Sequence, residues 1–82
     1  MRVAVFTMEG PEIVLVMTVY QAEGGGFRFE LEQRPVNDSE RQAAQFHSIL
    51  RYSTAEDAEA EGKRVTALLA RGKVDPDVLG TA

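Results

Sequence analysis

The chain has 82 residues, no cysteine and one histidine, and its net charge at pH 7 is −4. A chain this short folds as one domain with a modest core, so its stability is marginal unless disulfides, metals or oligomerisation add to it. The missing cysteines exclude disulfides and thiolate metal sites, and one histidine cannot make a histidine-rich metal site. Oligomerisation is the remaining source of extra stability.

The acidic balance, with a pI near 4.9, disfavours a general nucleic-acid binder, which usually carries a basic patch. The longest uncharged run, residues 13–22, is shorter than the ~20 residues that cross a bilayer. Glu9 and Glu12 interrupt the apolar N-terminal stretch, which a signal peptide would keep continuous. We therefore expect a cytoplasmic protein with no cofactor, no membrane partner and no nucleic-acid partner.

Two apolar segments begin the chain. Residues 2–8 predict a first strand, and Glu9-Gly10-Pro11 predicts the turn that follows it. Residues 13–21 predict a second strand, because their β-branched content argues against a helix. Side chains alternate between the faces of a strand, so this second strand is apolar on both faces.

A glycine-rich loop, residues 23–26, follows and predicts a hairpin. A phosphate-binding loop would lead into a helix, and in the P-loop would carry Lys-Ser/Thr, whereas a strand follows here. That third strand, residues 27–33, alternates apolar and charged side chains and ends before Pro35. Residues 36–45 are polar and predict a loop with room for one helical turn after Ser39.

The segment from Phe46 to Tyr52 fits two interpretations. As a strand, it places Phe46, Ser48, Leu50 and Tyr52 on one face, and His47, Ile49 and Arg51 on the other. As part of a helix that begins at Ser39, it aligns Ala43, Phe46 and Leu50 instead. We favour the strand, because Ser53-Thr54 then serves as a separate helix start.

The clearest local signal is a helix from Thr54 to Arg71. Thr54 fits an N-cap with Asp57 three positions later, and Gly72 fits the end of the helix. A stripe of small and apolar residues predicts its buried side, and Gly62 within it predicts a close approach to the sheet beneath Phe27, Phe29 and Phe46. The stripe consists of Ala55, Ala58, Gly62, Val65 and Leu69.

His47, Ser48 and either Asp38 or Glu40 contain the residue types of a catalytic triad. Any small protein offers such a trio, and triads are recognised by three-dimensional geometry. We therefore predict no catalytic residue here, and an enzyme is the third hypothesis for the function.

Glu30 and Glu32 share a strand face with Arg28 and Arg34. Paired carboxylates do acid–base chemistry only where burial separates their pKa values. On an open face they are solvated partners of neighbouring charges, which is the interpretation we prefer.

An acidic patch of Glu56, Asp57, Glu59 and Glu61 lies at the start of the predicted helix. Such a run suits the positive end of the helix dipole, and it could also imitate phosphates toward a basic partner. The second hypothesis is therefore a small acidic inhibitor or nucleic-acid mimic, of the kind that phage-derived genes encode.

The interface candidate that we favour is a set of apolar residues, which we expect on the outer face of the sheet, away from the helix. An exposed apolar patch usually marks an interface. We therefore predict a non-catalytic interaction or regulatory module that dimerises through this face, unless the 36–45 loop or the C-terminal tail covers it. The set consists of Ala4, Phe6, Val14, Val16 and Tyr20.

The stretch F-H-S-I-L-R-Y-S-T-A-E-D-A-E-A-E-G, residues 46–62, resembles the ending of several small stand-alone bacterial domains of unknown function. The resemblance implies a strand meander followed by one helix, and no activity. The double-stranded-RNA-binding fold also ends in three strands and a helix, but this chain lacks that fold's leading helix and its basic cluster.

We thus predict an α+β domain over residues 1–74, with an antiparallel sheet of three or four strands and one long helix across one face. Residues 75–82 are predicted to form a short tail.

Overall fold

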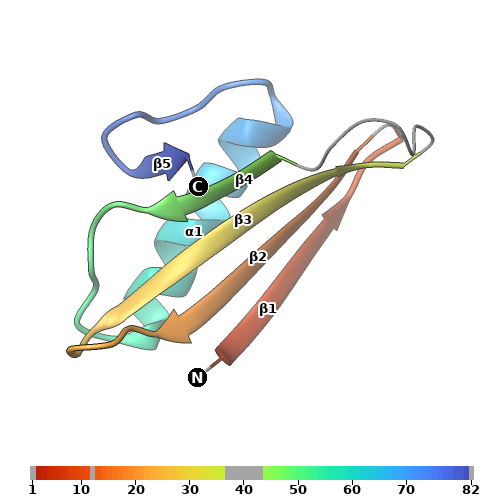
Figure 1. The fold of residues 1–82 in the computed structure, drawn as a ribbon. Helices are drawn as coiled ribbons and strands as arrows, with labels where there is room; N and C mark the ends of the chain where they lie inside the picture. Colours follow the sequence, from red (N-terminus) through yellow and green to blue (C-terminus); the bar gives the residue numbers. More distant parts are fainter. Residues whose placement is uncertain (1, 12, 37–43, 82) are drawn as a thin grey trace.

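The computed structural model describes residues 2–11, 13–36 and 44–81, and it confirms the α+β class (Figure 1). The sheet has five strands, one or two more than predicted. The elements are β1 (Arg2–Glu9), β2 (Ile13–Gln21), β3 (Phe27–Pro35), β4 (Ala44–Ser48), α1 (Ala55–Ala70) and β5 (Leu79–Thr81).

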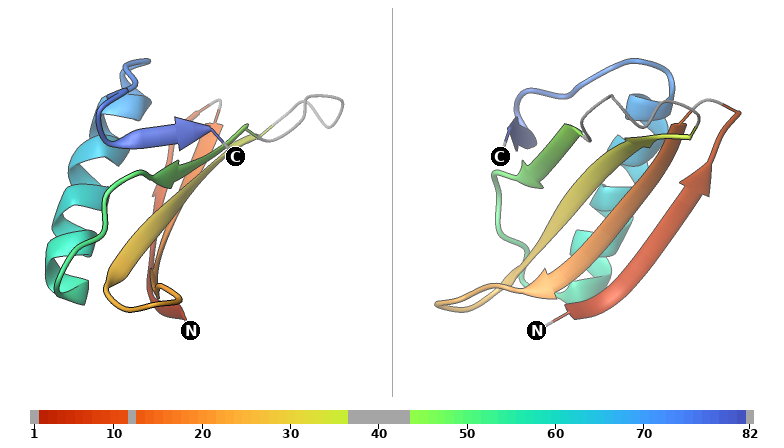
Figure 2. Two further views of the ribbon diagram at one scale, coloured as in Figure 1. Left: turned by 60° about the vertical axis from the view of Figure 1, so that its left-hand side comes forward. Right: turned by 45° about the vertical axis from the view of Figure 1, so that its right-hand side comes forward.

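The strands lie in the order β1-β2-β3-β4-β5, and every neighbouring pair is antiparallel. Helix α1 lies on one side of this sheet, so the domain has two layers (Figure 2). We call the sheet face against α1 the inner face and the opposite one the outer face. Among the described residues, no helix or strand covers the outer face.

The core lies between α1 and the inner face. Strands β2 and β3 supply every second side chain to it, since alternate residues of a strand share a face. The buried residues are Leu15, Met17, Val19, Phe29 and Leu31 from the sheet, Ala58, Val65 and Leu69 from the helix, and Val78 and Leu79 near the C-terminus.

The C-terminal segment belongs to the domain. Val78 and Leu79 are buried, and β5 pairs with β4 through residues 79–81. The backbone N–H of Ile49 also donates to the carbonyl of Val78 at 2.7 Å. The segment that we expected to be a short tail, residues 75–82, therefore contains the fifth strand of the sheet.

The strand interpretation of residues 46–52 is right for its first half. Strand β4 ends at Ser48, and Ile49 and Leu50 are exposed. The chain returns to the sheet at Tyr52, which exchanges two backbone hydrogen bonds of 2.8 Å with Phe27. The alternative helix from Ser39 through Leu50 is wrong for residues 44–48, while Ser39 lies outside the described residues.

Helix α1 begins and ends as predicted. The hydroxyl oxygen of Thr54 accepts a hydrogen bond of 3.1 Å from the backbone N–H of Asp57, so Thr54 is the N-cap. After the last helical residue, Gly72 adopts a φ of +76°, a conformation that favours glycine. The two ends of α1 are therefore fixed by local chemistry alone.

Gly62 lies where α1 approaches the sheet closely. A Cβ atom at this position would lie 2.9 Å from the sulfur of Met17, which is fully buried. The predicted packing reason for this glycine is therefore confirmed. Its three nearest atoms belong to Met17 on β2, not to the phenylalanines that we expected above it.

Gly62→Leu should lower the free energy of unfolding by about 1–3 kcal/mol, because a leucine side chain cannot fit against Met17 without moving the helix. Ala60→Leu is the matched control, since Ala60 is an exposed residue of the same helix. Urea denaturation of both variants measures the difference. Equal stabilities would contradict the assignment of Gly62 to the contact.

Candidate functional site

In its two middle rows, between Arg2 and Glu9 of β1, the outer face has an uncharged side and a charged side. The strand register places alternate residues of neighbouring strands in the same rows on this face. One row runs from Val5 through Thr18 and Glu30 to His47, and the next from Thr7 through Val16 and Glu32 to Gln45. The β1–β2 side of each row is uncharged, and charged side chains begin at β3.

Two of the five predicted interface residues lie on the wrong face. Ala4 pairs with Val19 and Phe6 with Met17, so both point toward the helix and pack against the core. Lys63 of α1 lies over the ring of Phe6, with its Nζ 5.3 Å from the ring centroid. The outward side of β1 includes Thr7 and Glu9, whereas Ala4, Phe6 and Met8 on the inward side are all apolar, as suits the core.

The other three predicted interface residues do lie on the outer face, all on β2. Val14, Val16 and Tyr20 alternate with the buried residues of that strand, and each is partly exposed. Val5 of β1, which the sequence analysis did not select, joins them and is 51% exposed.

On the charged side, Arg34 holds Glu32 in a two-point ion pair. Its Nε and Nη2 donate to the two carboxylate oxygens at 2.6 and 3.0 Å. This hydrogen bonding keeps the pKa of Glu32 below its usual value. Glu30 is exposed beside it. These carboxylates are thus solvated surface groups, as preferred above, although the partner of Glu32 is on the same strand.

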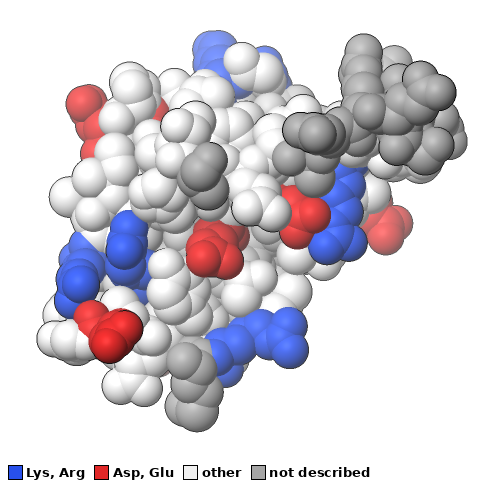
Figure 3. Space-filling model, viewed as in Figure 1, with Lys and Arg blue, Asp and Glu red and all other residues white. Residues whose placement is uncertain are grey.

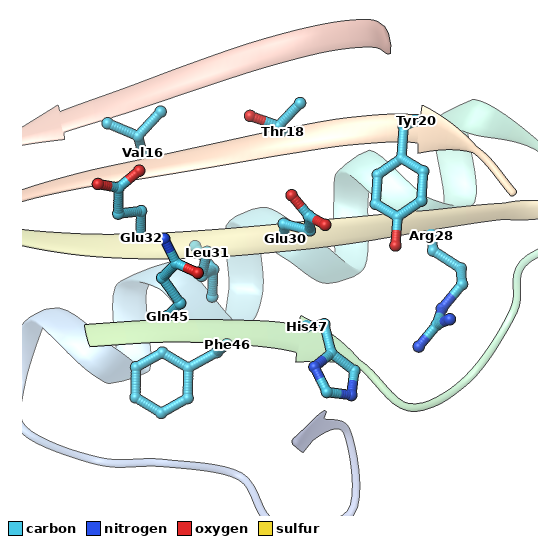
Figure 4. Close-up of a pocket in the computed structure, with 10 residues that line it drawn as sticks. All are labelled: Val16, Thr18, Tyr20, Arg28, Glu30, Leu31, Glu32, Gln45, Phe46 and His47. Carbon is cyan, nitrogen blue, oxygen red and sulfur yellow. The ribbon is translucent and has the colours of Figure 1, made fainter. Parts of the chain in front are cut away.

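A shallow hollow of about 340 Å³ lies over β2, β3 and β4 on the outer face. Figure 4 shows Thr18, Glu30 and His47 projecting from these three adjacent strands, with Tyr20 reaching across β3. The lining mixes acidic, basic and apolar side chains, and Figure 3 shows charges of both signs on the side of the molecule seen in Figure 1. Nothing in this mixture selects one class of ligand.

Ser48 fixes the end of β4 and the side chain of Arg28. Its buried hydroxyl oxygen accepts a hydrogen bond of 3.1 Å from the backbone N–H of Phe29. Its carbonyl oxygen accepts from Nε and Nη2 of Arg28, at 3.1 and 2.5 Å. Ser48 is therefore a structural residue, which satisfies a strand N–H in the core.

The triad drawn from the sequence does not form. His47 and Ser48 are consecutive strand residues, so His47 lines the outer hollow while the Ser48 hydroxyl is buried on the inner side. Asp38 and Glu40 lie outside the described residues.

Ser48→Ala should lower the free energy of unfolding by about 1–3 kcal/mol, because it leaves the buried N–H of Phe29 without its acceptor. Ser53→Ala is the control, since Ser53 is exposed. Thermal melts of both variants measure the effect. If the two substitutions cost the same, the hydroxyl of Ser48 does not stabilise the fold in this way.

The acidic patch is interleaved with bases. Glu59 pairs with Lys63 at 3.2 Å, and Glu61 pairs with Arg64. Arg64 also contacts Asp75, in the segment before β5, at 3.1 Å. Two of the four predicted patch residues are therefore partly neutralised, which suits a surface ion-pair network better than an imitation of phosphates.

Tyr52 carries an unusual phenol. Its ring stacks on Phe29 with a centroid distance of 5.9 Å, and its buried hydroxyl makes no hydrogen bond to any described residue. Burial raises the pKa of this phenol, and the nearby carboxylates of Glu61 and Asp75 raise it further against the opposing charge of Arg64. The folded state therefore favours neutral Tyr52.

Tyr52→Phe should leave the free energy of unfolding near neutral pH unchanged or slightly higher, because it removes a buried hydroxyl without a partner. A tyrosine in the unfolded chain titrates near ~10. Because folding raises the pKa of Tyr52, the preference of the fold for the neutral phenol adds to the free energy of unfolding. This stabilisation is complete below the unfolded-state pKa and is lost as the pH rises through the folded-state pKa.

The variant should therefore lose less stability than the unmodified protein between about pH 10 and 12. Tyr20→Phe, on the partly exposed outer face, is the control. Chemical denaturation across this pH range measures the difference. Parallel pH profiles for the unmodified protein and Tyr52→Phe would contradict the assignment.

Within the described part of the chain, no three His, Asp or Glu side chains are grouped so that they could hold a metal ion. Nor does it contain a helix of the length and apolarity needed to cross a membrane. Comparison with protein-family models, curated proteins and solved structures finds no match to this chain.

The sequence analysis considered the faces of the sheet and missed its edges. Among residues 2–11, 13–36 and 44–81, β1 pairs with β2 alone, so its other side is an open edge of eight residues in the described structure. The signal was present in the run V-A-V-F-T-M, residues 3–8, which contains no charge and no proline. An open backbone edge of this kind is a pairing site for another strand.

Proposed function

We propose that this protein is a non-catalytic interaction module that works as a homodimer, in which the two copies meet along the β1–β2 side. Val5 supports the proposal most directly, because it is half exposed in the middle of a long edge strand. Thr7 and Val16 continue the uncharged surface around it, as far as the Glu9–Val14 pair.

Physical reasons favour this side over the rest of the outer face. Stacking two whole outer faces would bury Glu30 and the Glu32–Arg34 pair, and the loss of hydration of such charges is costly. Contact at the β1–β2 side of the two middle rows, Val5–Thr18 and Thr7–Val16, buries no charged side chain and so has no such hydration cost. Contact there also adds buried apolar area to a chain whose own core is small.

Sedimentation of the unmodified protein at micromolar concentration tests the proposal. We expect a species of about twice the 9.0 kDa of one chain. Val5→Glu should shift it toward the monomer, because a carboxylate from each copy then lies at the contact. Gln21→Glu is the control with the same change of charge, at the exposed end of β2.

A single species of 9.0 kDa at every concentration would overturn the homodimer. Equal dissociation constants for the two variants would leave a homodimer but overturn its placement along the β1–β2 side, because a dimer that ignores a charge at Val5 does not use this side.

A further inference from the structure

We propose that the two copies pair β1 with β1 in antiparallel fashion, so that their sheets join into one sheet of ten strands. The inference rests on the proposed homodimer and names the surface at which it forms. A two-fold axis perpendicular to the sheet relates the copies, and each edge strand supplies the hydrogen-bonding groups that the other lacks.

The two edges of the sheet differ in how they are protected. Proteins keep edge strands from pairing by making them short or by placing lysine, proline, bulges or inward-pointing charges on them. β5 is protected because it has only three residues and so offers few backbone groups for pairing. β1 has eight residues, and its six central ones are uncharged.

The one irregularity of β1 lies near its start. The register with β2 shifts between Arg2 and Ala4, where β2 has no residue opposite Val3. From Ala4 to Glu9 the strand is regular. The unprotected part of the edge is therefore Ala4 to Met8, which spans ~17 Å at about 3.4 Å per residue.

Self-pairing of this stretch has one register that uses all of it. Residues directly opposite in an antiparallel pair share a face, so a centre at Phe6 places Phe6 against its own copy. Val5 then lies opposite Thr7, and Ala4 opposite Met8. Every pair is uncharged, and the pairs of β-branched and aromatic residues are those that stabilise antiparallel strands.

The contacts at β1 agree with this arrangement. Phe6 faces the helix side, where Lys63 lies over its ring, and Val5 is exposed on the outer side. The rotation keeps both helices on one side of the joined sheet, and the charged residues of β3 stay in water on the other. None of the paired residues 4–8 is charged, and Lys63 above Phe6 is paired with Glu59 of its own helix at 3.2 Å.

A pair of double variants tests the register. Val5→Lys with Thr7→Lys places like charges opposite each other in both symmetry-related pairs, whereas Val5→Lys with Thr7→Glu places opposite charges there. We expect the first variant to dissociate about tenfold more readily than the second, measured by sedimentation at low salt. Circular dichroism melts of the diluted proteins show whether both remain folded.

Val16→Glu separates edge pairing from face stacking. Val16 lies on β2, one strand away from the edge, so an edge-paired dimer should keep its affinity within about threefold. If Val16→Glu abolishes the dimer and the two double variants dissociate equally, the copies stack by their faces. That result overturns the β1 pairing and leaves the homodimer standing, whereas a monomeric unmodified protein overturns both.

Discussion

One helix covers one face of a five-stranded sheet, and this constraint decides which parts of the molecule are available for function. α1 can lie close to β2 because Gly62 offers no side chain where Met17 approaches. Alternate residues of β2 and β3 are thereby buried between the sheet and α1. The outer face and the edge of β1 receive no cover from any described element, so the candidate sites lie there.

Local chemistry predicted the elements that depend on neighbouring residues in the chain. The Thr54 cap and Gly72 gave correct positions, and the alternating pattern of β3 gave its two faces, because capping and pleating act over a few residues. The predicted end of this strand before Pro35 is wrong, since β3 includes Pro35, which pairs with Ile13. The alternation along β1 did carry a signal, since Thr7 and Glu9 share one face while Ala4, Phe6 and Met8 form an apolar set on the other. The sequence analysis did not use it and placed Ala4 and Phe6 on the wrong side.

Two further features depend on contacts between distant residues, and sequence patterns could not reveal them. β5 is a strand because Leu79 pairs with Ser48 and fills the core, although a segment of three residues carries too little pattern to be recognised. Ser48 is important because the strand N–H of Phe29, nineteen residues earlier, donates to its hydroxyl. The strand interpretation of this segment did place His47 and Ser48 on opposite faces, and the structure has them so.

The open edge of β1 also bears on the solubility of the chain. An unprotected edge strand invites pairing with any exposed strand, which is how many aggregates begin. In the proposed dimer, the two-fold axis uses both β1 edges at once, so this contact closes and cannot propagate. The joined sheet then ends at a β5 strand on each side, and three residues with a glycine at the centre offer little to a further strand. Pairing with a second copy would therefore remove the one long edge and leave only the edges that the fold already protects.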